Sequence, residues 1–273
     1  MKNLITRAFT GLIFVILIVG AICVHPYAFL LLFVLIVGLA LWEFYGFIKN
    51  NNKLIQRIIG MLGGMYLYAA SFFYAGGYVS SCIFLPYILF LLLILIAGLY
   101  HKTSNPVNDW AIALFAQFYC AGLFSSLNFI AFDSAHSYCQ FYILLIFAFV
   151  WLNDTGAYLV GTAIGKHRLF PRISPLKSWE GFWGGFIVAI AASQLLAWFY
   201  PENLTWYDLL ALSVIVVVFG TFGDLIESLM KRTYEVKDSG KLLPGHGGIL
   251  DRFDSVMFAS PAVFLYLELF IRN

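Results

Sequence analysis

Long apolar runs separated by short polar segments dominate the sequence. Nine of these runs approach the length of about 20 residues that a helix needs to cross a lipid bilayer. They lie near residues 5–24, 27–48, 57–76, 80–100, 109–132, 140–164, 180–200, 206–230 and 255–271. The third and ninth runs are the weakest, because glycines dilute the third and Pro261 interrupts the ninth. The pattern predicts an all-α polytopic transmembrane protein.

The composition excludes a soluble globular protein. Hydrophobic residues make up 62% of the chain and charged residues 11%, and the mean hydropathy is +0.88; such values are typical of proteins that cross a membrane several times. We expect residues 1–135 to form N-terminal scaffold helices and residues 136–273 to form a C-terminal catalytic region. That region would carry two cytoplasmic loops, residues 165–179 and 231–254.

The basic residues predict how the helices are oriented. Lys and Arg residues of short loops favour the cytoplasmic side of a membrane. With a cytoplasmic N-terminus, fifteen of the sixteen Lys and Arg residues fall on that side, and only Arg272 lies outside. Nine spans then place the C-terminus outside. Eight spans would place it inside together with Arg272, and the charge count does not exclude that arrangement.

An acidic residue within an apolar run is costly in a membrane unless it is paired, bound or hydrated, and Glu43 and Asp154 are two such residues. Glu43 lies near the cytoplasmic end of the second run, where a paired or interfacial role is as well supported as a functional one. Asp154 lies in the sixth run and is expected to face a polar cavity. The alternative for Asp154 is a structural hydrogen bond or an ion pair with Lys166 or another basic residue.

A basic loop follows the sixth run and ends where the next helix is predicted to start. Its basic residues are Lys166, His167, Arg168, Arg172 and Lys177. The sequence Ser178-Trp179-Glu180-Gly181 is typical of a capped helix start. The free amide groups of that helix end, next to the basic loop, would suit a phosphate group. Basic loops of this kind also occur for topology and attraction to anionic lipids alone.

The densest group of charges lies in residues 222–255, which contain five Lys and Arg, six Asp and Glu, one His and five Gly. Asp224, Ser228 and Lys231 share one face of the eighth predicted helix with Glu227. Acidic groups near the C-terminal end of a helix need a compensating cation. A glycine-rich turn that could present backbone amides to an anion follows.

Carboxylate oxygens without cysteine favour Mg²⁺ or Mn²⁺ as the bound ion. Together with Lys, Arg and exposed backbone amides, they indicate a site for a metal–polyphosphate complex. Phosphoryl or nucleotidyl transfer fits such a site, because these reactions depend mainly on positioning and charge neutralisation. The alternative is a salt-bridged loop that only caps a helical bundle.

Residues 228–254, hereafter the signature segment, read SLMKRTYEVKDSGKLLPGHGGILDRFD. They match the pattern S-x-x-K-R-x4-K-D-x-G-x2-L-P-x-H-G-G-x-x-D-R-x-D and resemble the signature of the phosphatidate cytidylyltransferase, or CDP-diacylglycerol synthase, family. NDTGAY and GKHRLFPRISPLKSWEG resemble a second conserved region of that family. Leu176 is a departure, because family members often have Lys there, and it puts one phosphate contact in doubt. The resemblance covers roughly residues 150–255.

The resemblance implies transfer of the cytidylyl group of CTP to phosphatidate, which gives CDP-diacylglycerol and pyrophosphate. It implies Mg²⁺ as cofactor and leaves a second metal ion open. The partners would be CTP, the membrane lipid phosphatidate and a second copy of the chain in a homodimer, with no nucleic acid. The location would be the bacterial cytoplasmic (inner) membrane, with the active site facing the cytoplasm.

The resemblance also assigns roles to individual residues. Asp224 and Asp251 would be metal ligands with Ser228 close by, aided by Asp254 or Asp154. The remaining catalytic candidates, which would hold phosphate groups or lie beside those that do, are Lys231, Arg232, Lys237, Asp238, His246 and Arg252. Further binding contacts would come from Lys177, Ser178, Gly247 and Gly248, and Lys166, Arg168 and Lys177 would contact the lipid headgroup. We expect His246 to donate a hydrogen bond, with a general-base role as the weaker alternative.

Two other functions stay open at this point. A cytidylyltransferase or a CTP-dependent kinase acting on another membrane lipid would use the same groups, and the products would separate the cases. A transporter could use Glu43, Asp154, Asp224 and Glu268 as an ion path. The charges crowd one predicted face of the membrane, whereas a transporter needs them near its middle.

Overall fold

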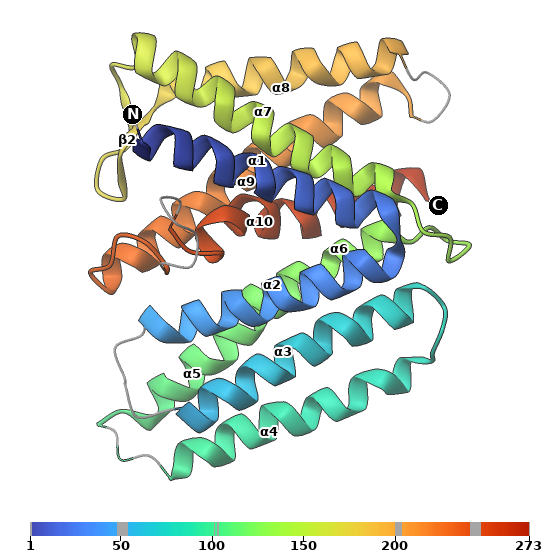
Figure 1. Ribbon diagram of the computed structural model, residues 1–273, viewed down its shortest axis with the longest axis vertical. Helices are drawn as coiled ribbons and strands as arrows, with labels where there is room; N and C mark the ends of the chain where they lie inside the picture. Colours follow the sequence, from blue (N-terminus) through green and yellow to red (C-terminus); the bar gives the residue numbers. More distant parts are fainter. Residues whose placement is uncertain are drawn as a thin grey trace. The chain divides into compact units, whose positions relative to one another are not determined.

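A computed structural model (Figure 1) describes residues 2–47, 54–100, 102, 104–199, 204–240 and 247–272, with the backbone alone for residues 2–9 and 47. Most of the described chain is helical, and the predicted all-α polytopic class is confirmed. The α-helices are α1 (Lys2–Val24), α2 (Pro26–Phe47), α3 (Leu54–Ala75), α4 (Leu85–Leu99), α5 (Pro106–Ala116), α6 (Leu123–Ala131), α7 (Gln140–Ile164), α8 (Trp179–Phe199), α9 (Trp206–Thr233) and α10 (Leu250–Tyr266).

Eight segments of the described chain are long and apolar enough to cross a membrane. The two weakest predicted runs are among them, as Leu54–Ala75 and Leu250–Ile271. The first predicted run coincides with α1, in which Thr10–Val24 forms a shorter apolar helix. One span, Pro106–Ala131, consists of α5 and α6 joined by a π-helical turn at Gln117–Gly122.

The chain divides into two compact units. The N-terminal unit comprises Met1–Gln140 and Tyr234–Phe253, and the C-terminal unit comprises Phe141–Thr233 and Asp254–Asn273. Most of the signature segment therefore belongs to the unit that contains α1 to α6. The expected division of scaffold and catalytic roles between residues 1–135 and 136–273 stays a prediction.

The N-terminal unit is a helical bundle in which α3 lies between α2 and α4 (Figure 1) and also packs against α6. Aromatic side chains fill its interior. Phe253, which is fully buried, contacts the rings of Phe14, Phe33 and Phe124 at centroid distances of 5.6, 6.0 and 5.5 Å. Aromatic pairs of this kind contribute about 0.5–1.5 kcal/mol each beyond the area that they bury. Phe253 thus anchors the end of the returning segment to the bundle.

Glycines bring α7 and α8 into close contact in the C-terminal unit. A Cβ atom added to Gly156 would lie 3.0 Å from the Cα atom of Gly185, and one added to Gly181 would lie 3.2 Å from that of Gly161. Such close approach is typical of helices with glycines spaced four residues apart, as Gly161 and Gly165 and also Gly181 and Gly185 are. The helix α8 also packs against α9.

The basic loop between α7 and α8 folds into a short antiparallel hairpin, β1 (Arg168–Phe170) and β2 (Ser174–Ser178), which the sequence did not predict. Glu180 closes it from the first turn of α8. Its carboxylate accepts hydrogen bonds from the backbone amides of Lys166 (3.1 Å) and His167 (3.2 Å), and it lies 2.6 Å from the His167 ring. The strand pairing and the Glu180 hydrogen bonds therefore give the basic loop between α7 and α8 one folded conformation.

The last long helix starts earlier than predicted. It was expected from residue 255, but α10 begins at Leu250, so that Asp251, Arg252 and Asp254 lie within its first turns. The prediction relied on apolarity, which these charged residues lack. An acidic residue is nevertheless favourable here, because the N-terminal end of a helix carries partial positive charge and free amide groups.

Candidate functional site

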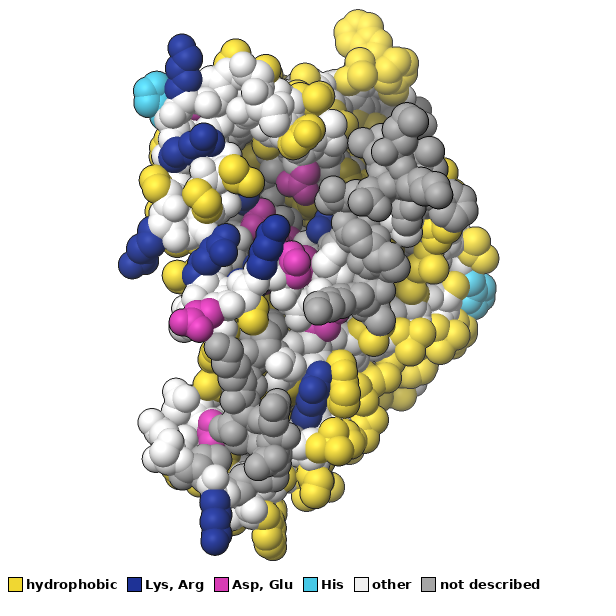
Figure 2. Space-filling model, turned by 60° about the vertical axis from the view of Figure 1, so that its left-hand side comes forward, with side chains coloured by type: hydrophobic (Ala, Val, Ile, Leu, Met, Phe, Trp, Pro, Cys, Tyr) yellow, Lys and Arg dark blue, Asp and Glu magenta, His cyan; other side chains and the backbone are white. Residues whose placement is uncertain are grey.

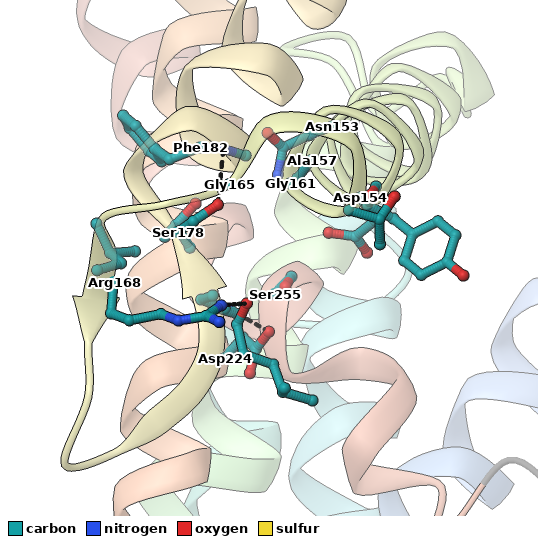
Figure 3. A pocket seen from close by; sticks show the side chains of 17 residues that line it. Asn153, Asp154, Ala157, Gly161, Gly165, Arg168, Ser178, Phe182, Asp224 and Ser255 are labelled. Carbon is teal, nitrogen blue, oxygen red and sulfur yellow. Dashed lines mark hydrogen bonds and ion pairs between the residues drawn. The ribbon is translucent and has the colours of Figure 1, made fainter.

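A pocket of about 610 Å³ lies in the C-terminal unit, among α7, the hairpin, α8, α9 and α10 (Figure 3). Its polar lining residues are Asn153, Asp154, Thr162, Arg168, Lys177, Ser178, Thr221, Asp224 and Ser255. Its larger apolar and aromatic lining residues are Tyr158, Leu169, Leu176 and Phe182. A pocket of this composition suits a ligand that has both charged and apolar parts.

An ion pair between Lys177 and Asp224 joins two of the elements that line this pocket. Lys177 comes from β2 and Asp224 from α9, and their side chains are 30% and 32% exposed. The other Asp224 oxygen, Oδ1, accepts a hydrogen bond of 3.1 Å from Ser228 Oγ, one helical turn later. Asp224 therefore has the compensating cation that we expected for an acid in the last turns of this helix.

The remaining polar residues at this end of α9 also have partners. Lys231 Nζ lies 3.3 Å from Oε1 of Glu227, whose side chain is fully buried. Arg232 is exposed, and its Nε donates a hydrogen bond of 3.3 Å to the backbone oxygen of Ile173 in the turn of the hairpin. The predicted shared face is confirmed by the two i,i+4 contacts, Asp224–Ser228 and Glu227–Lys231.

Ser178 caps α8, as the sequence predicted. Its Oγ accepts a hydrogen bond of 3.1 Å from the backbone amide of Gly181. Cβ atoms added to Gly161, Gly165 or Gly181 would each lie within 3.3 Å of this oxygen, so three glycines make room for it. The cap keeps the N-terminal end of α8 at the wall of the pocket.

Asp154 of α7 lines this pocket and so borders a cavity, while its expected role in binding stays a prediction. Arg168 reaches the same pocket from β1, and its guanidinium donates a hydrogen bond of 3.2 Å to the backbone oxygen of Leu176 (Figure 3). Thr221 and Ser255 also line it. They were missed because single hydroxyl residues in apolar helices carry no distinctive sequence signal.

Basic side chains cover the surface near the hairpin. Lys166, Arg168, Arg172 and Arg232 are all exposed. Figure 2 views the molecule from the side of the hairpin and shows Lys and Arg side chains exposed there. A surface of this kind attracts anionic ligands, including phosphate groups and acidic lipid headgroups.

Asp251 and most of the other predicted residues of the signature segment belong to the N-terminal unit. Asp251 Oδ2 accepts hydrogen bonds from the backbone amides of Ser239 (2.9 Å) and Gly248 (2.8 Å). The Gly248 amide was expected to contact phosphate, and a phosphate would have to replace Asp251 as its acceptor. Gly247 has a φ of 81°, in the left-handed region that favours glycine.

The other predicted residues of this segment fall into two groups. Lys237, Asp238 and Arg252 are exposed and therefore accessible to a ligand. His246 lies outside the described residues, so its expected role stays a prediction. Asp224 and Asp251, the two expected metal ligands, belong to different units.

The donors in the C-terminal unit fit a hard divalent cation by their chemistry. Asp224, Ser228 and Asp254 offer only oxygen atoms, which Mg²⁺ prefers. Asp254 is buried and close enough to Asp224 and Lys177 to interact with their charges. In the described part of the chain, no three His, Cys, Asp or Glu side chains form a group that could hold a metal ion. Water and substrate oxygens would have to complete the coordination shell, as is usual for Mg²⁺.

Comparison with known proteins points to one family. The sequence matches the Cytidylyltransferase family over residues 5–270. The phosphatidate cytidylyltransferases of Staphylococcus haemolyticus (strain JCSC1435) and Staphylococcus aureus (strain COL) are each 48% identical to it over 141 residues. These matches cover 52% of this chain and 54% of each relative. The phosphatidate cytidylyltransferase of Staphylococcus saprophyticus is 51% identical over 126 residues, which is 46% of this chain and 48% of that protein. The matched part of the chain thus spans about half the length of each of these relatives.

Proposed function

The chain belongs to the cytidylyltransferase family, and from this we propose that it transfers the cytidylyl group of CTP to phosphatidate in a membrane. The products would be CDP-diacylglycerol and pyrophosphate. The names of the staphylococcal relatives support this reaction. The structural observation that carries the proposal is the Lys177–Asp224 pair at a pocket that combines charged with apolar walls.

The reaction needs no protein nucleophile, because the phosphate of phosphatidate is already an anion near neutral pH. One of its oxygens attacks the α-phosphorus of CTP. A bond forms between that oxygen and the α-phosphorus, while the bond from the α-phosphorus to the bridging oxygen breaks and pyrophosphate leaves. The chain's contribution is to position both substrates and to offset their negative charge.

Basic residues and a helix end would supply that charge. Lys177, at the pocket, would contact a phosphate group once Asp224 is engaged elsewhere. Exposed Arg232, Lys237 and Arg252 would hold the phosphates of CTP. The N-terminal end of α8 adds the positive end of a helix dipole.

Mg²⁺ is the proposed cofactor, and a second ion stays open. Asp224 and Asp251 would hold it, with Ser228 close by and Asp254 or Asp154 in support. When bound, Mg²⁺ would neutralise charge on the phosphate groups. Binding of an ion at Asp224 would release Lys177 for the substrate, since both cations compete for the same carboxylate.

The setting of the site forms part of the proposal. Phosphatidate would enter sideways from the lipid, past exposed Leu176 and Tyr158, and its headgroup would meet Lys166 and Arg168. The positive-inside rule supports a site on the cytoplasmic side of a bacterial inner membrane. We further propose that the protein acts as a homodimer without a nucleic-acid partner.

A test of the proposed function is pyrophosphate release by the purified protein in detergent, with Mg²⁺ and phosphatidate. CTP is compared with ATP, GTP and UTP, and each component is omitted in turn. Release that requires CTP, phosphatidate and Mg²⁺ together, with CDP-diacylglycerol as the lipid product, is the expected result. CTP-dependent release that requires another lipid, or nucleotide consumption without pyrophosphate, would contradict the proposal.

A further inference from the structure

Glu43 is a buried acid of α2 that the proposed chemistry does not use. It is 8% exposed, and its Oε2 accepts two hydrogen bonds from the signature segment. One comes from Ser239 Oγ and the other from the backbone amide of Leu250, each at 3.0 Å. The donors lie on opposite sides of residues 241–246 in the sequence. A single carboxylate therefore holds both flanks of the glycine-rich part of the segment.

The same carboxylate explains one glycine of the signature segment. The three atoms nearest to a Cβ atom added to Gly240 all belong to Glu43, and its carboxyl carbon would be 2.6 Å away. Any side chain at this position would displace Glu43. Gly248 is also crowded, by Glu43, by Ser239 and by the backbone nitrogen of Gly240. The nearest obstacle to a side chain at Gly240 is therefore Glu43, whereas at Gly248 it is both Glu43 and the segment itself.

Ser239 links Glu43 to the proposed metal ligand Asp251. Ser239 Oγ lies 3.0 Å from Glu43 Oε2 and 3.0 Å from Asp251 Oδ2. Leu250, which donates to Glu43, directly precedes Asp251 on α10. Both contacts that Glu43 makes thus restrain the position of Asp251.

We propose that Glu43 is a positioning residue of the active site, which holds the signature segment so that Asp251 and the Gly247–Gly248 turn face CTP and its metal ion. This proposal rests on the proposed function for its substrate and metal. It gives the N-terminal bundle a positioning role, which is carried by one acidic side chain. Glu43 itself does not touch the reacting atoms.

Hydrogen exchange tests the positioning step without substrate. Glu43→Ala should speed exchange of the Leu250 amide at least about tenfold, because that amide loses its acceptor. Glu43→Gln keeps an acceptor oxygen and should have a smaller effect. Gln56→Ala is the matched control, since Gln56 is buried in the same unit and bonds to Ile94 instead. Unchanged exchange in Glu43→Ala would overturn the proposal whatever the protein's activity.

Steady-state kinetics tests the consequence for the site. Glu43→Ala should raise the KM for CTP at least about tenfold, and the Mg²⁺ concentration for half-maximal rate should rise with it. Gln56→Ala should leave both values unchanged even if it lowers the unfolding temperature. An unchanged KM in Glu43→Ala, in a wild type that is active with CTP, would refute the positioning role. A wild type without CTP-dependent activity would instead refute the proposed function.

A double-mutant cycle separates positioning from general packing. Gly240→Ala should impair the wild type and have little further effect in the Glu43→Ala background, because the colliding atoms are gone. Gly248→Ala should impair both backgrounds, because it also meets Ser239 and the backbone. Equal impairment by Gly240→Ala in both backgrounds would overturn the proposal.

Discussion

Lys177 and Asp224, 47 residues apart in the sequence, form an ion pair at the wall of one pocket. Their pairing holds the hairpin against α9. It also keeps a cation on the carboxylate that is proposed to bind Mg²⁺. The pair is half of a site that a metal ion and a phosphate would complete, with the metal on Asp224 and the phosphate on Lys177.

Asp224→Asn should lower pyrophosphate release by about 100-fold or more, because it removes the charge that would bind the metal ion and balance Lys177. Membrane insertion should be unaffected. Asp208→Asn, at the other end of α9, is the matched control; Asp208 bonds to Tyr266 and is remote from the pocket lining. Near-normal turnover by Asp224→Asn would remove the metal assignment.

Leu176→Lys should lower the KM for the phosphorylated substrates by up to about fivefold. Leu176 lines the pocket but is 85% exposed, so a Lys side chain fits there without cost to folding. An exposed charge pair contributes about 0.2–1 kcal/mol, which sets the size of the effect. The comparison is Leu176→Met, which has similar bulk and no charge. An equal change in both variants would show that charge is not the cause.

Ser178→Ala should lower the free energy of unfolding by about 1 kcal/mol, because the Gly181 amide loses its cap. Thermal unfolding in detergent, followed by circular dichroism, measures the change. Ser80→Ala serves as the control, since Ser80 occupies an N-cap position without making a side-chain cap hydrogen bond. Equal losses in the two variants would argue against a capping role for Ser178.

Gly185→Ala should destabilise the protein by about 1–3 kcal/mol, because the added methyl group meets the backbone oxygen of Asn153 on α7. Gly20→Ala, within α1, should instead be neutral or stabilising by up to about 1 kcal/mol. A Cβ atom there has no heavy atom within 4 Å. The midpoints of thermal unfolding of the two variants should therefore move apart. A shared shift would contradict close packing of α7 against α8.

The sequence predicted the features that depend on neighbouring residues. Apolar length identified the spans, because the bilayer sets that length. The i,i+4 spacing predicted the contact of Asp224 with Ser228, and the Ser178 cap followed from local sequence alone. Each of these features is decided within one or two helical turns.

Contacts between distant segments could not be predicted in this way. The Lys177–Asp224 pair and the Glu43–Leu250 contact require knowledge of which helix ends meet, and apolar runs do not specify this. The start of α10 was missed because charged residues open an otherwise apolar helix. The hairpin was missed because its strands are short and one contains Pro175.

The return of Tyr234–Phe253 to the N-terminal unit has a consequence for biosynthesis. Glu43 is translated 196 residues before Ser239, its partner. At about 5–20 residues per second, this interval lasts roughly 10–40 s. During that time the nascent chain holds the Glu43 carboxylate without the two donors that later bind its Oε2. Glu43 on α2 can therefore make these contacts only after the signature segment has been synthesised.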